Sequence, residues 1–153
     1  MKKLILLFLA AMTSCFAADI TLSQLDESKA ERREKAFENW IPVAESQVQF
    51  EALNAEGRFP IYSEREGGKI REIFIDKPKG LAYGAWGSMN ETELLKKHAQ
   101  YHEEGYVILS LRLRPEGDGE MKYWGVWINE SLERKVTRDL KRLGISQASI
   151  EID

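Results

Sequence analysis

One segment of the sequence repeats the plan of another, and this repetition limits the possible folds more than any other feature. Residues 69–76 and 122–129 both start with lysine, continue with a run rich in apolar residues and end with Asp or Asn. A predicted helix that ends at a Glu-Gly pair precedes each of them, at Gly57 and at Gly105. A unit of this kind must bury its apolar face against its neighbours. The sequence therefore predicts tandem copies of one supersecondary unit.

The first predicted copy covers residues 43–76 and consists of a helix and two strands. Glu45–Glu56 has the pattern of a helix, and Gly57 supplies the left-handed residue that commonly ends one. The Glu66-Gly67-Gly68 sequence predicts a hairpin turn, because glycine accepts the positive φ angles that tight hairpins need. Residues 77–89 are predicted to link this copy to the next.

The second predicted copy covers residues 90–129 and has the same plan. Asn90 and Glu93 form a capping-box pattern at the start of its helix. Residues 130–153 predict a partial third copy with one helix and one strand. In the first strand of the second copy, apolar residues alternate and are expected to share one face: Val107, Leu109, Leu111 and Leu113.

Joined in order, these elements predict an α+β fold. Strands linked by short hairpins pair antiparallel, and the helices between hairpins would cover one face of the sheet. We therefore expect tandem helix-strand-strand repeats that form an antiparallel sheet of about five strands with helices on one face. The uncovered face would carry two arginines and two aromatic residues, namely Arg112, Arg114, Tyr123 and Trp127.

Residues 1–17 have the composition of a signal peptide. Lys2 and Lys3 precede an apolar run that is too short to span a bilayer, and Ala17 stands at the usual last position before cleavage. The sequence thus predicts export, to the periplasm or as a secreted protein. The alternative is a lipoprotein in which Cys15 is acylated, and only in that case do we expect attachment to a membrane.

After this segment, residues 18–42 predict a charged N-terminal helix, and residues 43–153 form the predicted repeat domain. The chain is mildly acidic, with a formal net charge of −3, and no basic stripe stands out in the sequence. These properties argue against nucleic acid as a partner. Cleavage after residue 17 would remove the single cysteine, which excludes disulfides and a cysteine nucleophile. We expect no cofactor, because Gly84–Gly87 lacks the lysine and hydroxyl residue of a phosphate loop.

Three segments resemble the repeats of a known family. They are Trp86–Leu95, which contains a helix start, Tyr101–Tyr106, which ends in Gly-Tyr, and Lys122–Trp127, an aromatic strand. Together they resemble the bacterial tandem repeat domain, and the likeness covers residues 43–129. Similar repeats form the N-terminal half of polyglycine hydrolases, ahead of a β-lactamase-like catalytic part. The resemblance implies a repeat module without that chemistry, since the chain contains no Ser-x-x-Lys dyad.

His98 and His102 are the only histidines, and their spacing places both on one face of a helix. Two imidazoles at this spacing can share an ion such as Zn²⁺, with Glu91 or Glu103 as a further ligand. Against this, His98 aligns with Phe50 of the first copy, which favours a packing role. A metal site at His98 and His102 is therefore an alternative hypothesis.

Residues of the second hairpin form the favoured binding site. Tyr123 and Trp127 can anchor a protein or stack on sugar rings. Arg112 and Arg114 can hold a carboxylate or phosphate, although cross-strand pairing with glutamates is the competing interpretation. The leading hypothesis is an exported non-catalytic binding module whose partner is an envelope or extracellular protein, or a glycan. The alternatives are a metal-binding protein or metal-dependent enzyme, and a structural or inhibitory module that acts on an exported hydrolase.

Overall fold

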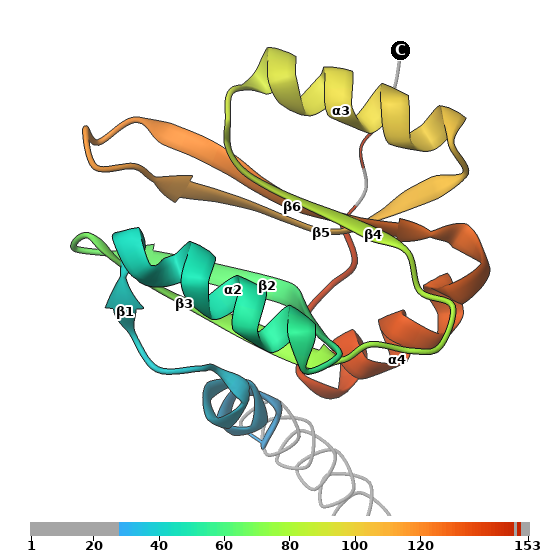
Figure 1. The fold of residues 1–153 in the computed structure, drawn as a ribbon, viewed down its shortest axis with the longest axis horizontal. Helices are drawn as coiled ribbons and strands as arrows, with labels where there is room; N and C mark the ends of the chain where they lie inside the picture. Colours follow the sequence, from blue (N-terminus) through green and yellow to red (C-terminus); the bar gives the residue numbers. More distant parts are fainter. Residues whose placement is uncertain (1–27, 149, 151–153) are drawn as a thin grey trace, which may run out of the picture.

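The structure, a computed structural model, describes residues 28–148 and 150 and shows an α+β fold with two three-stranded antiparallel sheets (Figure 1). The strand that comes last in each half of the sequence lies at the centre of its sheet. The first sheet has the order β1-β3-β2, with strands Ile41–Pro42, Lys69–Asp76 and Arg58–Glu66. The second sheet has the order β4-β6-β5, with strands Tyr83–Met89, Met121–Asn129 and Tyr106–Pro115.

Helices connect and flank these strands. The 3-10 turn η1 (Val43–Glu45) leads into α2 (Ser46–Ala55). α3 (Glu91–Glu103) joins β4 to β5, and after β6 the 3-10 turn η2 (Glu130–Leu132) leads into α4 (Glu133–Arg142). Residues 28–36 are also helical. No helix within the described residues has the length and the apolar character needed to cross a membrane.

Most local signals in the sequence act as predicted. The side chain of Asn90 accepts a hydrogen bond from the backbone N–H of Glu93, and the Glu93 side chain accepts one from the backbone N–H of Asn90, which confirms the capping box. Gly57 follows α2 with a φ angle of 81°. Gly67 and Gly68 both have positive φ between β2 and β3, as a two-residue hairpin turn requires.

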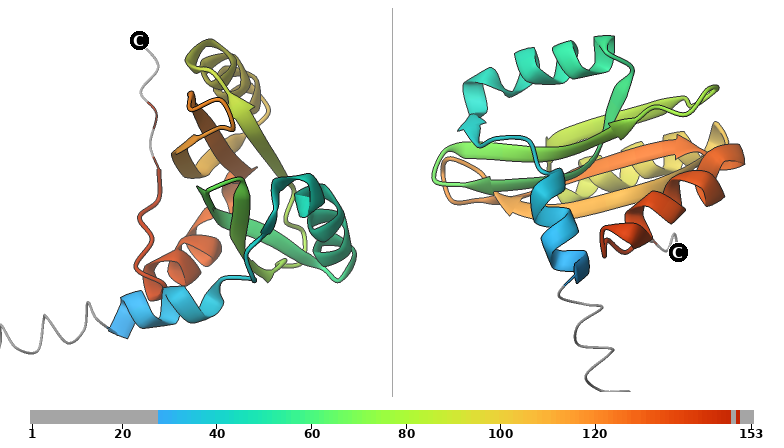
Figure 2. Two further views of the ribbon diagram at one scale, coloured as in Figure 1. Left: turned by 90° about the vertical axis from the view of Figure 1, so that its left-hand side faces the viewer. Right: turned by 90° about the horizontal axis from the view of Figure 1, so that it is seen from below.

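The expectation of one sheet of about five strands is wrong. Residues 83–89, predicted as part of a linker, form β4, which pairs with β6 and completes a separate second sheet. Gly84 and Gly87 obscured this strand, because glycine weakens the sequence pattern of a strand. Helices on a single face were also expected wrongly, since α3 and α4 pack against opposite faces of the second sheet (Figure 2).

Two hydrophobic cores meet at β6. Alternate side chains of a strand point to opposite faces, so β6 contributes to both cores. Trp127 belongs to the core beneath α3, where its side chain is fully buried. The larger core lies between the two sheets and is closed by α4; its members include Trp124, Val126, Ile128, Val136 and Leu140.

A β-bulge in β5 changes which residues of this strand are buried. Leu109 is one extra residue relative to the facing strand β6, because the pairing register shifts between residues 108 and 110. Beyond the bulge, Leu113 is 48% exposed, whereas Arg114 is 6% exposed. The prediction of one shared apolar face is therefore wrong for the set Val107, Leu109, Leu111 and Leu113.

Several expectations for the N-terminal part concern residues outside those described. They include the signal peptide at residues 1–17, Cys15 and the first part of the predicted helix at residues 18–42. The described part of that helix ends at residue 36. Phe37 then forms an antiparallel bridge with Ile73 of β3, so this segment is attached to the first sheet.

The C-terminal segment passes the second sheet without joining it as a strand. Residues 145–148 are assigned to no strand, although the backbone N–H of Ala148 donates to the carbonyl oxygen of Leu109 at 3.2 Å. The predicted strand of a partial third copy is therefore not formed by the part of the segment that the structure describes.

Gly125 lies at the centre of β6 beneath the Trp127 ring. A Cβ atom at this position would lie 2.8 Å from Cη2 of Trp127. We expect Gly125→Ala to lower the free energy of unfolding by about 1–3 kcal/mol through overpacking. Gly117→Ala is the matched control, because a Cβ there would meet no atom within 4 Å. Urea unfolding measures both variants, and equal stabilities would contradict the tight packing at β6.

Candidate functional site

Tyr123 and Trp127 lie on the face that α3 covers, where Trp127 is fully buried and Tyr123 is partly buried. The Trp127 ring stacks on the Tyr101 ring with centroids 5.2 Å apart. Its Nε1–H donates to Nδ1 of His98 at 3.1 Å. Tyr123 packs against the same core. The prediction that the two aromatic residues lie on an uncovered sheet face is therefore wrong, because α3 covers that face.

His98 and His102 lie on one face of α3, as predicted, with ring centroids 6.3 Å apart. Burial lowers the pKa of His98, and the nearby His102 lowers it further, while a hydrogen bond with the backbone of Ile150 opposes both effects. The Nδ1 atom of His98 is already occupied by Trp127. Among the residues that the structure describes, no three His, Cys, Asp or Glu side chains are grouped closely enough to hold a metal ion. The two histidines thus lack a third ligand there.

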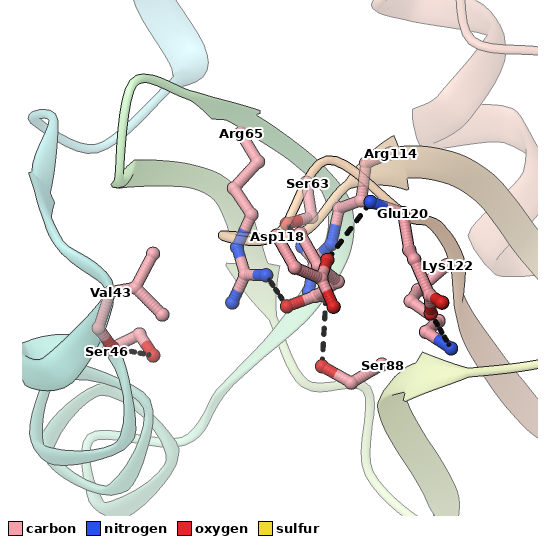
Figure 3. Close-up of polar contacts among 10 residues, drawn as sticks. Val43, Ser46, Ser63, Arg65, Ser88, Arg114, Asp118, Glu120 and Lys122 are labelled. Atoms are coloured by element: carbon pink, nitrogen blue, oxygen red, sulfur yellow. Dashed lines mark hydrogen bonds and ion pairs between the residues drawn. The ribbon is translucent and has the colours of Figure 1, made fainter.

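Arg112 and Arg114 point between the two sheets, away from the α3 side. The guanidinium of Arg112 lies over the Tyr62 ring, 4.5 Å from its centroid. Arg114 is buried, and its Nη1 donates to Oγ of Ser63 on β2 (Figure 3). The structure therefore separates the predicted arginines from the predicted aromatic residues and places Arg114 in a buried polar cluster.

This cluster lines a cleft of about 280 Å³ between α2, the first sheet and β4. The first half of α2 forms one wall, and residues 85–88 of β4 form another. Arg65 and Arg114 bring two positive charges to the cleft, and Glu72 brings one carboxyl group. Ligand pockets usually start at about 300 Å³, so the cleft suits one small group. Aromatic side chains complete its lining: Phe50, Trp86 and Trp124.

Ser88 contributes to the cleft because β4 is irregular at this point. The pairing of β4 with β6 shifts register between residues 86 and 89. Ser88 has a φ angle of 58°, in the left-handed region that residues other than glycine seldom occupy. Its Oγ donates to Oε1 of Glu116 at 2.9 Å, and Oε2 of Glu116 pairs with Arg65 (Figure 3). Because backbone strain of this kind concentrates at functional sites, the irregularity supports a functional role for the cleft.

Gly87 leaves the Arg114 guanidinium open to the cleft. A Cβ atom on Gly87 would lie 3.1 Å from Nη2 of Arg114 and 3.5 Å from Cδ1 of Trp124. Any larger side chain would therefore press on the guanidinium from the side of β4. The backbone at residue 87 does not itself require glycine, since Gly87 has no positive φ. Glycine is needed here because a side chain would contact Arg114.

Burial governs the electrostatics of the cluster. It lowers the pKa of Arg114 to about 10, with Arg65 adding to the effect, and it raises the pKa of Glu72. Burial would also raise the pKa of Glu116, but hydrogen bonds from Arg65 and Ser88 outweigh it, and that pKa is lowered. Arg114 therefore stays charged at neutral pH, and Glu72 is the more readily protonated of the two carboxyl groups.

Some donors of the cluster remain unused. The Nε atoms of Arg65 and Arg114 are buried and have no hydrogen-bond partner within the described part of the chain; the same is true of Nε of Arg112, which lies outside the cleft. Leaving a buried donor unpaired is costly. A guanidinium can bind a carboxylate or phosphate through two parallel hydrogen bonds. The Nε atoms themselves have almost no exposed surface, so the part of Arg114 that faces the cleft is Nη2, next to Gly87.

The sequence indicated Arg114 as a site residue, but its pattern did not indicate four other polar residues of the cluster. They come from three further strands, which meet only because the two sheets pack together. The Gly-Ser pair in β4 is the one local signal, since glycine inside a strand often marks a bulge. The residues missed are Ser63, Arg65, Glu72 and Ser88.

No family model matches the chain, no curated protein matches it, and no solved structure matches it. The protein is therefore classified by its own fold and candidate site. It is an α+β protein with two three-stranded antiparallel sheets and a cleft, lined by arginine, between α2 and β4.

The burial of His98 makes stability depend on pH. Because its pKa in the folded chain is below the ordinary 6.5, the unfolded chain binds more protons than the folded chain just below that pH. The contribution of neutral His98 to the free energy of unfolding is complete above about pH 6.5. It is lost as the pH falls toward the pKa of His98 in the folded chain. Between about pH 7 and pH 5, we expect the wild type to lose more stability than His98→Gln, measured by urea unfolding at each pH.

The difference between the two proteins isolates His98. The raised pKa of Glu72 changes stability in the opposite direction, but it does so in both proteins. Glutamine can still accept the hydrogen bond from Trp127. His102→Gln, at an exposed position, is the control and should keep most of the wild-type pH dependence. Identical profiles for the wild type and His98→Gln would show that His98 is not buried as described.

Proposed function

We propose that the chain is a non-catalytic binding protein that holds an anionic group of its partner in the cleft between α2 and β4. The observation that carries this proposal is Arg114, a buried guanidinium that lines the cleft and has an unpaired Nε. Arg65 lines the same cleft, although its charge is paired with Glu116. Phe50 and Trp124 offer apolar contact to the body of the bound group.

The partner that we propose is an envelope or extracellular protein that presents a carboxylate. A volume of about 280 Å³ suits an acidic side chain or a terminal carboxylate better than a cofactor. A glycan that carries a carboxylate offers the same chemistry to the same arginines. Recognition by a buried guanidinium favours such planar groups, because both oxygens can be bound at once.

We further propose that the chain is exported and that its domain consists of repeats. The composition of residues 1–17 supports a periplasmic or secreted location, with lipidation at Cys15 as the alternative. Both halves of the domain run strand, helix, strand, strand, and both sheets place the third of these strands between the other two. This common order, together with the resemblance of residues 43–129 to the bacterial tandem repeat domain, supports two copies of one unit.

Arg114→Lys tests the site directly. Lysine keeps the positive charge but cannot form the two parallel hydrogen bonds of a guanidinium. We expect the affinity for succinate and for inorganic phosphate to fall about tenfold, which corresponds to about 1.4 kcal/mol. Arg112→Lys is the matched control, because Arg112 lies on the same strand but stacks on Tyr62 and does not line the cleft. NMR titration at low ionic strength measures both affinities.

In the wild type, the shifted resonances should cluster in α2 and β4, which form the walls of the cleft. Thermal unfolding of both lysine variants shows whether a lost affinity reflects a lost fold. The proposal fails if the wild type binds neither succinate nor phosphate. It also fails if Arg112→Lys weakens binding as much as Arg114→Lys does.

Capture from an envelope extract on the immobilised chain tests whether the partner is a protein. Gly87→Ala narrows the cleft at Arg114 without removing a charge, so we expect it to retain about tenfold less of a captured protein. Gly117→Ala, in open space, should retain as much as the wild type. Mass spectrometry identifies and quantifies the protein. A protein retained equally by both variants would have its contact outside the cleft.

A further inference from the structure

Two basic segments from opposite ends of the chain lie side by side in the structure. Figure 2 shows α4 next to the helical segment at residues 28–36. The Nε atom of Arg32 donates to the carbonyl oxygen of Arg142 at 3.1 Å, and Nη1 of Arg33 donates to that of Gly144 at 3.3 Å. These carbonyl groups lie at the C-terminal end of α4, where backbone acceptors lack partners within the helix. The two bonds therefore fix the first segment against the second.

The outer side of α4 is entirely cationic. Val136 and Leu140 define its buried side. Successive residues of a helix are about 100° apart around its axis. On this basis, every basic residue of α4 lies within about 60° of the direction opposite to the buried side. The two acidic residues lie on the flanks: Asp139 faces Arg142 at 3.8 Å, and Glu133 accepts a hydrogen bond from Gln147. The basic residues of α4, all exposed, are Arg134, Lys135, Arg138, Lys141 and Arg142.

The neighbouring segment extends this cationic surface. It contributes four basic residues, Lys29, Arg32, Arg33 and Lys35. One of its two acidic residues, Glu34, is engaged by Arg71 of the first sheet. Lys29, Arg33 and Lys141 line a groove of about 690 Å³ between the two segments. The two segments together thus carry nine basic and four acidic residues, in a chain whose net charge is −3.

We propose that this face, formed by residues 28–36 and α4, docks on a membrane surface that carries anionic phospholipid headgroups. The outer side of α4 carries exposed cations and no exposed apolar residue, which matches a headgroup layer, where each Lys or Arg near the surface adds to the attraction. Neither segment contains an aromatic residue, so neither offers the aromatic platform on which proteins stack the bases of single strands, and the chain as a whole is acidic. These observations favour a lipid surface over a nucleic acid.

The sequence before residue 28 points to the same surface. The apolar run of residues 4–12 precedes this segment in the chain. If that run enters a membrane during export, or if Cys15 carries lipid, the face at residue 28 is the part of the domain nearest to the bilayer along the chain. The docking proposal does not depend on the anion cleft, because no residue that lines the cleft belongs to either basic segment.

The test is co-sedimentation of residues 18–153, the chain that remains after the predicted cleavage, with phosphatidylcholine vesicles that contain either no phosphatidylglycerol or about one third phosphatidylglycerol. Lys135→Glu/Arg138→Glu reverses two charges on the outer side of α4 and leaves Arg32 and Arg33 in place. We expect this double variant to bind the anionic vesicles at least about tenfold more weakly than the wild type. Raising the salt concentration from about 50 mM to about 300 mM should release the wild type.

Lys69→Glu/Lys96→Glu is the matched control, with the same change in net charge at two exposed lysines in the first hairpin and on α3. It should bind anionic vesicles nearly as well as the wild type, and circular dichroism checks the fold of both variants. Equal loss in both double variants would overturn the proposal, since net charge alone would then explain binding. Equal binding to neutral and anionic vesicles, or binding only to an added DNA or RNA oligonucleotide, would also overturn it.

Discussion

Strand β6 is covered on both of its faces, and the rest of the domain is arranged around this strand. The five residues from Trp124 to Ile128 are buried in succession, beneath α3 on one side and between the sheets on the other. β4 and β5 pair with its two edges, so its backbone is hydrogen-bonded on both sides. Gly125 leaves room for the Trp127 ring at the centre. A strand buried in this way needs cover on both faces of its sheet, which explains why α3 and α4 lie on opposite sides.

Two irregularities in the strands next to β6 convert this apolar frame into a polar site. The bulge at Leu109 turns Arg114 inward, and the shift of register in β4 brings the Ser88 hydroxyl to Glu116. Buried charges reduce stability unless they are fully paired, and the Nε of Arg114 is not. Stability alone therefore does not account for this cluster. An anion bound in the cleft beside Arg114 would offset the cost of burying its charge.

Charge is distributed unevenly over the molecule, although no basic stripe is visible in the sequence. The cations gather where residues 28–36 meet α4, whereas the cleft lies between α2 and β4. Because the two places share no residue, a molecule held at a surface through its cations would keep the cleft for a separate ligand. The two proposed interactions are thus physically independent, and a variant in one place is a suitable background for studying the other.

The sequence by itself determined several local elements of this protein: the hairpin turn at Gly67, the capping box at Asn90, the ends of α2 and α3 at Gly57 and Gly105, and the α+β class. Each depends on residues a few positions apart. The burial of Trp127 and the inward direction of Arg114 were decided by the tertiary structure. Strand alternation has a period of two, so one extra residue such as Leu109 reverses it, and nothing local marks that residue. The cleft and the basic face join residues that are distant in sequence, up to 110 positions apart for Arg32 and Arg142, and only the packing of the sheets and α4 brings such residues together.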